Sequence, residues 1–146
     1  MQLNRQISLT FPEESHKIIG AAMAVHRYFG CGFSEKVYQD AFEVELQKQG
    51  IPFRREVQLH AFYNETELAS TFIPDFICYD KIIIEMKAVK EIEDIHRSQA
   101  INYAKVSGFP LAILINFGES SLKFERWRIR CSTMMNYYKG ILTGSW

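Results

Sequence analysis

The chain has 146 residues, of which 47% are hydrophobic and 23% charged, and its 17 basic side chains balance 17 acidic ones. This composition is typical of a soluble globular protein and excludes disordered and fibrous classes. A chain of this length buries one core and not comfortably two, so we expect a single domain over residues 1–146. The zero net charge argues against a protein that coats nucleic acid by bulk charge, although a local basic stripe is compatible with it.

The three cysteines, Cys31, Cys78 and Cys131, are far apart and odd in number, so they cannot form a closed disulfide framework. A reducing compartment fits this pattern. No segment approaches the roughly 18 apolar residues of a membrane span, and the first ten residues lack the pattern of a signal peptide. We therefore expect a cytoplasmic protein that does not associate with membranes.

The first third of the chain predicts two helices. The first begins at Pro12, which two acidic residues follow, and continues to about Phe29 before Gly30 ends it. Ser34 can cap the second helix, which ends at Gly50. The expected buried positions recur at helical spacing: Ile18, Ala22, Val25 and Phe29 in the first helix, and Val37, Ala41 and Val44, joined by Tyr38 and Phe42, in the second.

From Arg54 the apolar residues alternate with polar ones, which is typical of strands. The expected elements are strands at 54–63, 68–79 and 82–88, a helix at 91–107, and strands at 111–117 and 122–130. The apolar strand at 82–88 is expected at the centre of the sheet. The order is helix, helix, three strands, helix, two strands, which predicts an α/β fold. Residues 131–146 show no clear period.

The most informative polar residues are Asp75, Glu85 and Lys87. Glu85 and Lys87 are two apart in an expected strand, so they project on the same side of it. A three-residue loop at 79–81 places Asp75 directly opposite Glu85, with Cβ atoms about 4.5–5.5 Å apart. A two-residue loop would turn Asp75 to the other face. If Asp75, Glu85 and Lys87 form one site, the loop at 79–81 must therefore have three residues.

Two carboxylates this close repel each other unless a cation or a proton lies between them. Their hard oxygen atoms suit Mg²⁺ or Mn²⁺ better than zinc. Lys87 beside them can orient a water molecule or stabilise charge on a phosphate, so the group is equipped for metal-assisted hydrolysis of a phosphodiester. The alternative is a surface hairpin with an ordinary Asp, Glu and Lys, because short patterns of this kind often arise by chance.

Several further motifs occur in order with this group. They are His26, Gly32-Phe33-Ser34-Glu35-Lys36-Val37-Tyr38, Pro74-Asp75, Glu85-Met86-Lys87, Gln99 with Tyr103, and Asn116-Phe117-Gly118. In these residues the chain resembles the PD-(D/E)XK nuclease superfamily, and within it the bacterial family named for its GxxExxY signature. Cys31 and Ser34 depart from that pattern, because a proline and an apolar residue are expected there.

The resemblance implies a restriction-endonuclease-like core with the order α-β-β-β-α-β, in which helices flank a central mixed sheet. It also implies residue roles. Asp75 and Glu85 would be metal ligands, Met86 would lend its backbone carbonyl, and Lys87 would act on the water. Glu35 would be an additional acid at the metal and Gln99 a polar helper.

Some of these residues also have structural explanations. An acid such as Glu35 is favoured in the first turn of a helix by the helix dipole, and His26 suits the end of a helix for the same reason. Gln99 shares a helix face with His96 and Tyr103, and these three side chains can satisfy one another. The same face carries Ile92 and Ile95, so we expect it to point toward the core.

Candidate phosphate contacts lie on two late elements: Lys90, Arg97 and Lys105 near the third helix, and Lys123, Arg126, Arg128 and Arg130 on the last strand. The last three alternate along the strand, so they predict a one-sided basic ladder. The alternative is a solvated edge whose charges discourage aggregation.

These observations predict a nuclease that depends on Mg²⁺ or Mn²⁺ and cleaves DNA rather than RNA, because DNA is the usual substrate of the superfamily that the chain resembles. The alternative is a noncatalytic module that binds nucleic acid or protein and retains the nuclease fold. A protein partner or a second copy of the chain is compatible with either interpretation.

Overall fold

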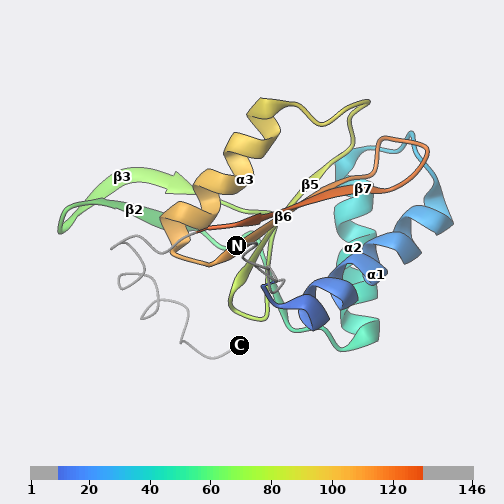
Figure 1. The fold of residues 1–146 in the computed structure, drawn as a ribbon, viewed down its shortest axis with the longest axis horizontal. Helices are drawn as coiled ribbons and strands as arrows, with labels where there is room; N and C mark the ends of the chain where they lie inside the picture. The colour runs from blue at the N-terminus through green and yellow to red at the C-terminus, as the bar shows by residue number, and fades with distance from the viewer. Residues whose placement is uncertain (1–9, 130–146) are drawn as a thin grey trace, which may run out of the picture.

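A computed structural model describes residues 10–129 as three helices and seven strands (Figure 1). The elements are α1 Pro12–Phe29, α2 Glu35–Gln49, β1 Phe53–Arg55, β2 Leu59–Tyr63, β3 Thr66–Phe72, β4 Phe76–Cys78, β5 Ile82–Lys87, α3 Asp94–Ser107, β6 Leu111–Asn116 and β7 Lys123–Arg128. Arg130 and residues 131–146 lie outside the described residues.

Five strands form one mixed sheet in the order β1-β4-β5-β6-β7. β5 and β6 are parallel and α3 connects them, whereas the other neighbours are antiparallel. α1 and α2 pack on one face of this sheet and α3 on the other (Figure 1). The prediction of an α/β fold with helices flanking a mixed sheet is confirmed.

The central position expected for β5 is confirmed, because it lies between β4 and β6 and is buried on both faces. Ile82, Ile84 and Met86 pack against the core on the side of α1 and α2, and Ile83 packs on the side of α3. By the same alternation Glu85 lies on the α3 side of the sheet. An acid at a position that is only 2% exposed has to be explained by its neighbours.

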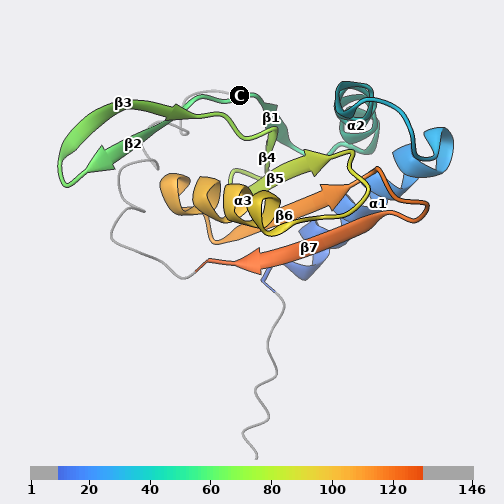
Figure 2. The same cartoon turned by 90° about the horizontal axis from the view of Figure 1, so that it is seen from above.

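The expected strands at 54–63 and 68–79 are each divided in two. Glu56 has a left-handed φ of 56°, which ends β1, and Pro74, which has no N–H to donate, separates β3 from β4. Between these two breaks, β2 and β3 form a separate two-stranded sheet that extends away from the main one (Figures 1 and 2). Pro74 was the sequence signal for this break.

Some expected core positions are wrong. α2 buries Tyr38, Phe42 and Leu46, whereas Val44 is 62% exposed. Ile95 is 72% exposed, and α3 begins at Asp94 rather than at residue 91. Ser34 occupies the N-cap of α2, but its side chain makes no capping hydrogen bond. No helix within residues 10–129 is long and apolar enough to cross a membrane.

Candidate active site

The turn between β4 and β5 has the length that the sequence predicts. Cys78 pairs with Ile82 and Phe76 with Ile84, so residues 79–81 form a three-residue loop. Tyr79 and Asp80 adopt left-handed φ angles of 55° and 57° to make it. This register brings Asp75, which immediately precedes β4, to the level of Glu85.

Asp75 and Glu85 are joined through backbone amides. The Asp75 N–H donates to Glu85 Oε1 at 3.0 Å, and the Met86 N–H donates to Asp75 Oδ2 at 2.7 Å. The second oxygens, Asp75 Oδ1 and Glu85 Oε2, accept no hydrogen bond from residues 10–129. Each carboxylate is therefore fixed by one oxygen and keeps the other available.

Burial raises the pKa of both carboxyls. Burial is the largest cause for Glu85, and the nearby charge of Asp75 raises its pKa further. For Asp75, burial again raises the pKa, while the hydrogen bond from Met86 opposes it. The charge of Lys87 lowers both pKa values to a smaller extent. The pair is therefore short of positive charge, which a divalent cation would supply.

Lys87 and Met86 flank the pair on β5. Lys87 is half-buried and, two residues after Glu85, projects on the same side of the strand. The Met86 side chain packs in the core beside α1 and α2. Its N–H points toward Asp75, and because the N–H and C=O of one residue in a strand point to the same side, its carbonyl also faces the end of β4.

Glu35 begins α2 and lies close enough for its charge to raise the pKa of both Asp75 and Glu85. The amide of Gln39 donates to its Oε1 at 3.4 Å. Within residues 10–129, however, no three side chains of His, Cys, Asp or Glu are grouped to hold a metal ion. The structure thus places Glu35 beside the pair as a charge, and does not bring it into one ligand cluster with them.

Sequence reasoning missed Glu56. Its N–H donates to the Asp75 carbonyl oxygen at 3.1 Å, and its charge also raises the Asp75 pKa. In the sequence it occupies a polar position of an alternating strand. Its approach to Asp75 depends on the left-handed backbone that ends β1, which the alternation gave no reason to expect.

The segment after Lys87 is fixed by Asn116, which is fully buried. Asn116 Oδ1 accepts from the Val89 N–H at 3.0 Å, and its Nδ2 donates to the Val89 carbonyl at 2.9 Å. The Phe117 N–H donates to the Lys87 carbonyl at 2.8 Å. A Cβ at Gly118 would lie 2.2 Å from the Val89 carbonyl oxygen, so glycine is required. The Asn116-Phe117-Gly118 motif therefore positions the backbone around Lys87.

Tyr38 connects this motif to the start of α2. Its ring stacks on Phe117 with centroids 4.8 Å apart, and its hydroxyl donates to the Gly30 carbonyl and accepts from the Phe33 N–H. His26 contacts the Glu119 carbonyl through Nε2 at 2.9 Å. The GxxExxY tyrosine and His26 thus hold loops together and do not approach the carboxylates through any hydrogen bond.

Gln99 is not brought to the carboxylates. Its amide donates to the Tyr103 hydroxyl at 3.1 Å on the same helix, and it makes no hydrogen bond to Asp75, Glu85 or Lys87. His96 does not join it, because its Nδ1 accepts from the Glu93 N–H and caps α3. The expected polar face of α3 is therefore satisfied locally, and Gln99 has no observed role at the site.

Some of the predicted phosphate contacts are occupied by ion pairs within the protein, and others are exposed to solvent. Arg97 donates to both oxygens of Glu125, at 3.1 and 2.8 Å, and to Asp94 at 2.7 Å, so its charge is largely neutralised. Exposed side chains remain at Lys90, Lys105, Lys123 and Arg128. Arg130 lies outside the described residues.

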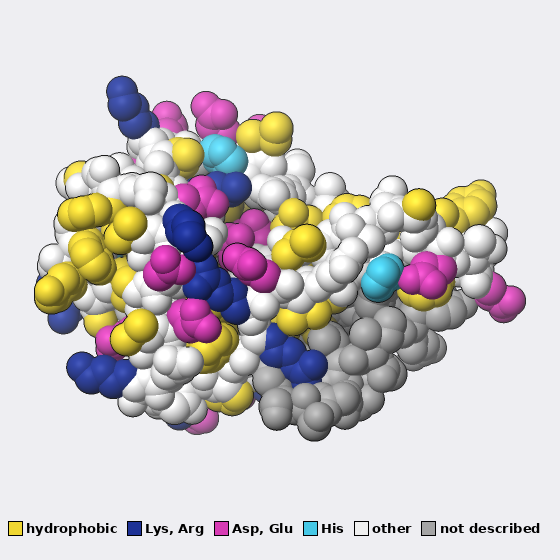
Figure 3. All heavy atoms as spheres, turned by 180° about the vertical axis from the view of Figure 1, so that it is seen from behind, with side chains coloured by type: hydrophobic (Ala, Val, Ile, Leu, Met, Phe, Trp, Pro, Cys, Tyr) yellow, Lys and Arg dark blue, Asp and Glu magenta, His cyan; other side chains and the backbone are white. Residues whose placement is uncertain are grey.

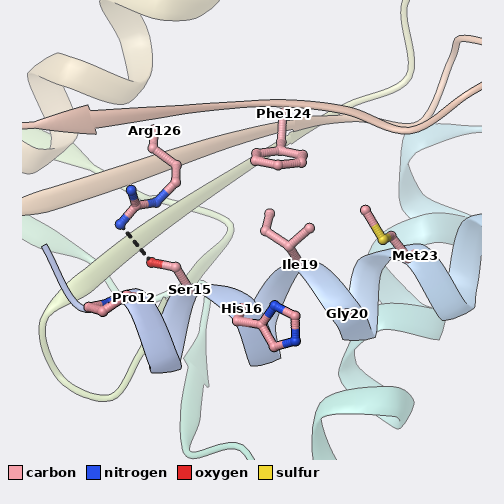
Figure 4. Close-up of a pocket in the computed structure, with 8 residues that line it drawn as sticks. All are labelled: Pro12, Ser15, His16, Ile19, Gly20, Met23, Phe124 and Arg126. Carbon is pink, nitrogen blue, oxygen red and sulfur yellow. Dashed lines mark hydrogen bonds between the residues drawn. The ribbon is translucent and has the colours of Figure 1, made fainter. Parts of the chain in front are cut away.

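Arg126 does not point into solvent as a ladder requires. It extends from β7 to α1, where its Nη2 donates to Ser15 Oγ at 3.0 Å (Figure 4). The same nitrogen also donates to the Thr10 carbonyl. Its partner on β6 is Ile113, which packs on the side of α1 and α2, whereas Glu85 lies on the side of α3. The continuous basic ladder is therefore wrong for Arg126, which fastens β7 to α1.

The residues present fit a divalent cation. Two carboxylates offer free oxygens, and strand geometry turns the Met86 carbonyl toward the start of β4. Water can complete the coordination of Mg²⁺, which commonly takes one or two protein carboxylates. Their raised pKa values indicate that the pair needs such a charge. Soft or imidazole ligands are absent from this pair, which is consistent with a hard ion rather than zinc.

A mixed sheet flanked by helices, with an Asp just before one strand and a Glu-x-Lys on the antiparallel neighbour of that strand, corresponds to a restriction-endonuclease-like fold. A family model of the PD-(D/E)XK nuclease superfamily matches residues 12–129, and the chain therefore belongs to this superfamily. Its members are generally nucleases and typically use divalent metal ions. Neither the comparison with curated proteins nor that with solved structures gives a match.

Proposed function

We propose that the chain is a nuclease that depends on Mg²⁺ or Mn²⁺ and hydrolyses phosphodiester bonds at Asp75, Glu85 and Lys87. The observation that carries the proposal is the exchange of hydrogen bonds between Asp75 and the Glu85-Met86 segment, which fixes two acids of raised pKa beside a lysine. An ion pair that served stability alone would lower the pKa of its acids.

In this proposal Asp75, Glu85 and the Met86 carbonyl hold the ion, which when bound would polarise the phosphate and activate water. Lys87 lies on the Glu85 side and orients the attacking water or stabilises charge on the phosphate. Glu35 and Glu56 add negative charge around the ion. Asn116 keeps the backbone on both sides of Lys87 in place.

The finer assignments belong to the same proposal. We favour DNA over RNA from the usual substrate of the superfamily, and membership of the GxxExxY family from Gly32, Glu35 and Tyr38. Lys90, Lys105, Lys123 and Arg128 are the exposed members of the predicted phosphate contacts. A single domain over residues 1–146, a cytoplasmic location and a bacterial origin stay predictions from the sequence.

The test is incubation of the purified chain with single-stranded, duplex, branched and flap DNA, and with matched RNA, in Mg²⁺, Mn²⁺ or chelator. We expect cleavage in Mg²⁺ or Mn²⁺ that stops in chelator and in Asp75→Asn and Glu85→Gln. If the chain binds nucleic acid without cleaving any substrate, even with protein in excess, the noncatalytic module replaces the nuclease. Cleavage that survives in both variants would indicate a contaminating enzyme.

A further inference from the structure

Aromatic rings are exposed where α1 ends and the chain turns into α2. Tyr28 is 83% exposed and Phe33 49% exposed, with the partly buried Phe29 between them. The ring centroids of Tyr28 and Phe29 are 4.9 Å apart, and those of Phe29 and Phe33 are 5.1 Å apart. Figure 3 shows hydrophobic side chains gathered at the end of the molecule that α1 and α2 form. Large exposed rings in a group are typical of a binding surface.

This aromatic row, defined as Tyr28, Phe29 and Phe33, is anchored in the fold. The Phe33 N–H donates to the Tyr38 hydroxyl, and the rings of Phe33 and Tyr38 lie edge to face with centroids 6.3 Å apart. Tyr38 in turn stacks on the buried Phe117. The exposed rings are thus the outer end of a chain of ring contacts that begins in the core, so little ordering would be needed when they bind a ligand.

The row is next to the candidate active site. Phe33 precedes Glu35 by two residues, and its ring contacts Tyr38, which stacks on Phe117, whose N–H donates to the Lys87 carbonyl. The end of α1, the start of α2 and the carboxyl end of β5 lie at the same end of the molecule (Figure 2). The rings pack on the side of α1 and α2 and Glu85 lies on the side of α3, so a strand cleaved at Asp75 and Glu85 would reach the rings by passing over this end of the sheet.

The charge nearby is compatible with a nucleic acid. Arg27, adjacent to Tyr28, is exposed and can contact a phosphate. The β2–β3 hairpin also exposes large apolar side chains, Tyr63 and Leu68, but it carries no Lys or Arg between residues 56 and 74. Of these two surfaces, the aromatic row is the one that has a cation beside its exposed rings and lies at the same end of the molecule as the carboxylates.

We propose that the aromatic row stacks unpaired nucleobases of the strand being cleaved, so that the substrate has a single-stranded segment at the active site. This proposal rests on the proposed nuclease function. Flat rings stack on any base, whereas the bases of an intact duplex are already stacked on each other and present no face to Tyr28 or Phe33. The row would thus select single strands, flaps or frayed ends without reading sequence.

The experiment measures binding in EDTA, in which metal-dependent cleavage is prevented, to a single-stranded oligonucleotide with a fluorescent adenine analogue and to a blunt duplex of the same sequence. Tyr28→Ala and Phe33→Ala should each weaken single-strand binding by about fivefold or more, as expected for loss of one stacked base. Duplex binding should stay within about twofold of the parent. Stacking on the rings should quench the fluorescence of the adenine analogue. Phe33→Trp, which keeps an aromatic ring, should retain the affinity and the quenching that Phe33→Ala loses.

The matched control is Val44→Ala, which removes an exposed apolar side chain from α2 away from the row and should not change either affinity. Equal affinity of the parent and both alanine variants for the single strand would overturn the proposal, as would an equal loss on single strand and duplex, or no binding by the parent. If the parent stacks bases but cleaves nothing in Mg²⁺ or Mn²⁺, the row stands and the nuclease function fails. If the parent cleaves but the alanine variants bind single strands as tightly as it does, the nuclease function stands and the role of the row fails.

Discussion

The protein contains two pairs of closely spaced acids, and the surroundings of the two pairs shift carboxyl pKa values in opposite directions. Around Arg55, the guanidinium contacts Asp40 at 2.8 Å and Glu43 at 2.7 Å, and the hydrogen bond from Arg55 lowers the Asp40 pKa. Asp75, before the start of β4, faces Glu85, near the carboxyl end of β5. Burial together with repulsion from the charge of Asp75 raises the pKa of Glu85. The first group is complete as it stands, whereas the second needs a cation.

The difference separates structural from functional charge. Arg55 also lies over the Phe76 ring, 5.5 Å from its centroid, so its cluster supports the sheet next to Asp75. An acid paired with a guanidinium has its charge balanced within the fold and does not need a bound cation. Two buried acids without a cation cost stability, and such a cost is typical of a site that is retained for function. The two groups therefore provide an internal comparison for mutagenesis.

The largest effect should follow removal of either opposed carboxylate. Asp75→Asn and Glu85→Gln keep an oxygen that can accept the observed backbone hydrogen bond, so the fold should survive. Loss of a metal ligand costs several kcal/mol in the transition state, and we expect cleavage to fall by about 10³-fold or more. The measurement is single-turnover cleavage in Mn²⁺. Near-parental rates in both variants would mean that the observed cleavage does not depend on these acids.

Lys87→Met should distinguish a role in cleavage from a role in metal binding. Removal of a proton-transfer or charge-stabilising group reduces rates by about 10²- to 10⁴-fold. Since Lys87 is not an expected ligand, Mn²⁺ should bind this variant as tightly as the parent, which titration calorimetry checks. Loss of metal binding together with cleavage would mean that the side chain holds the site in shape, and undiminished cleavage would remove Lys87 from the mechanism.

In the metal-free protein, the contribution of Asp75 and Glu85 to stability should fall as the pH rises. Asp75 and Glu85 have raised pKa values in the folded state, so folding favours their protonated forms. Their contribution to stability is then highest below the ordinary carboxyl pKa of about 4 and falls as the pH rises through the raised values, by about 1.4 kcal/mol for each unit of upward shift. In chelator, Asp75→Asn should therefore melt above the parent at pH 8 and equal it at low pH.

Mn²⁺ should reverse that order, because an ion that binds the folded state alone adds about 2.7 kcal/mol at a hundredfold excess over Kd. The parent should gain this stability at pH 8, and Asp75→Asn should not. Thermal melts in chelator and in Mn²⁺ across pH supply the measurement. A parent whose melting temperature ignores Mn²⁺, or gains only as much as the variant does, would contradict the metal site.

Much of the fold could be predicted because its information is local. Hydrophobic spacing located α1, α2, β5 and α3 to within a few residues, and the apolar run of β5 indicated a central strand. The site geometry followed from parity alone, since a three-residue turn at 79–81 fixes which residue faces Glu85. That prediction needed no knowledge of the rest of the chain.

The remaining features depend on tertiary contacts. The sequence could not show that Arg126 turns to Ser15 on α1, because alternation fixes the face of a strand and not what covers that face. Gln99 donates a hydrogen bond to Tyr103 on its own helix. Helical spacing puts both His96 and Tyr103 beside Gln99 and does not decide between them. Glu56 approaches Asp75 because β1 ends in a left-handed residue, and Glu is not a residue that favours this conformation.

The smallest effect should follow Asp40→Asn, the control from the other group of acids. Asp40 is largely exposed and its pKa is lowered by Arg55, so it stabilises the fold above its ordinary pKa and ceases to do so as the pH falls through the lowered value. The variant should melt slightly below the parent at pH 8 and should approach it in acid or in high salt, with cleavage unchanged. Asp40→Asn and Asp75→Asn, which make the same chemical change, should thus shift metal-free stability in opposite directions at pH 8. Melts of the two variants side by side give the sign directly, and a shift of the same sign in both would mean that the contrast between the two groups is wrong.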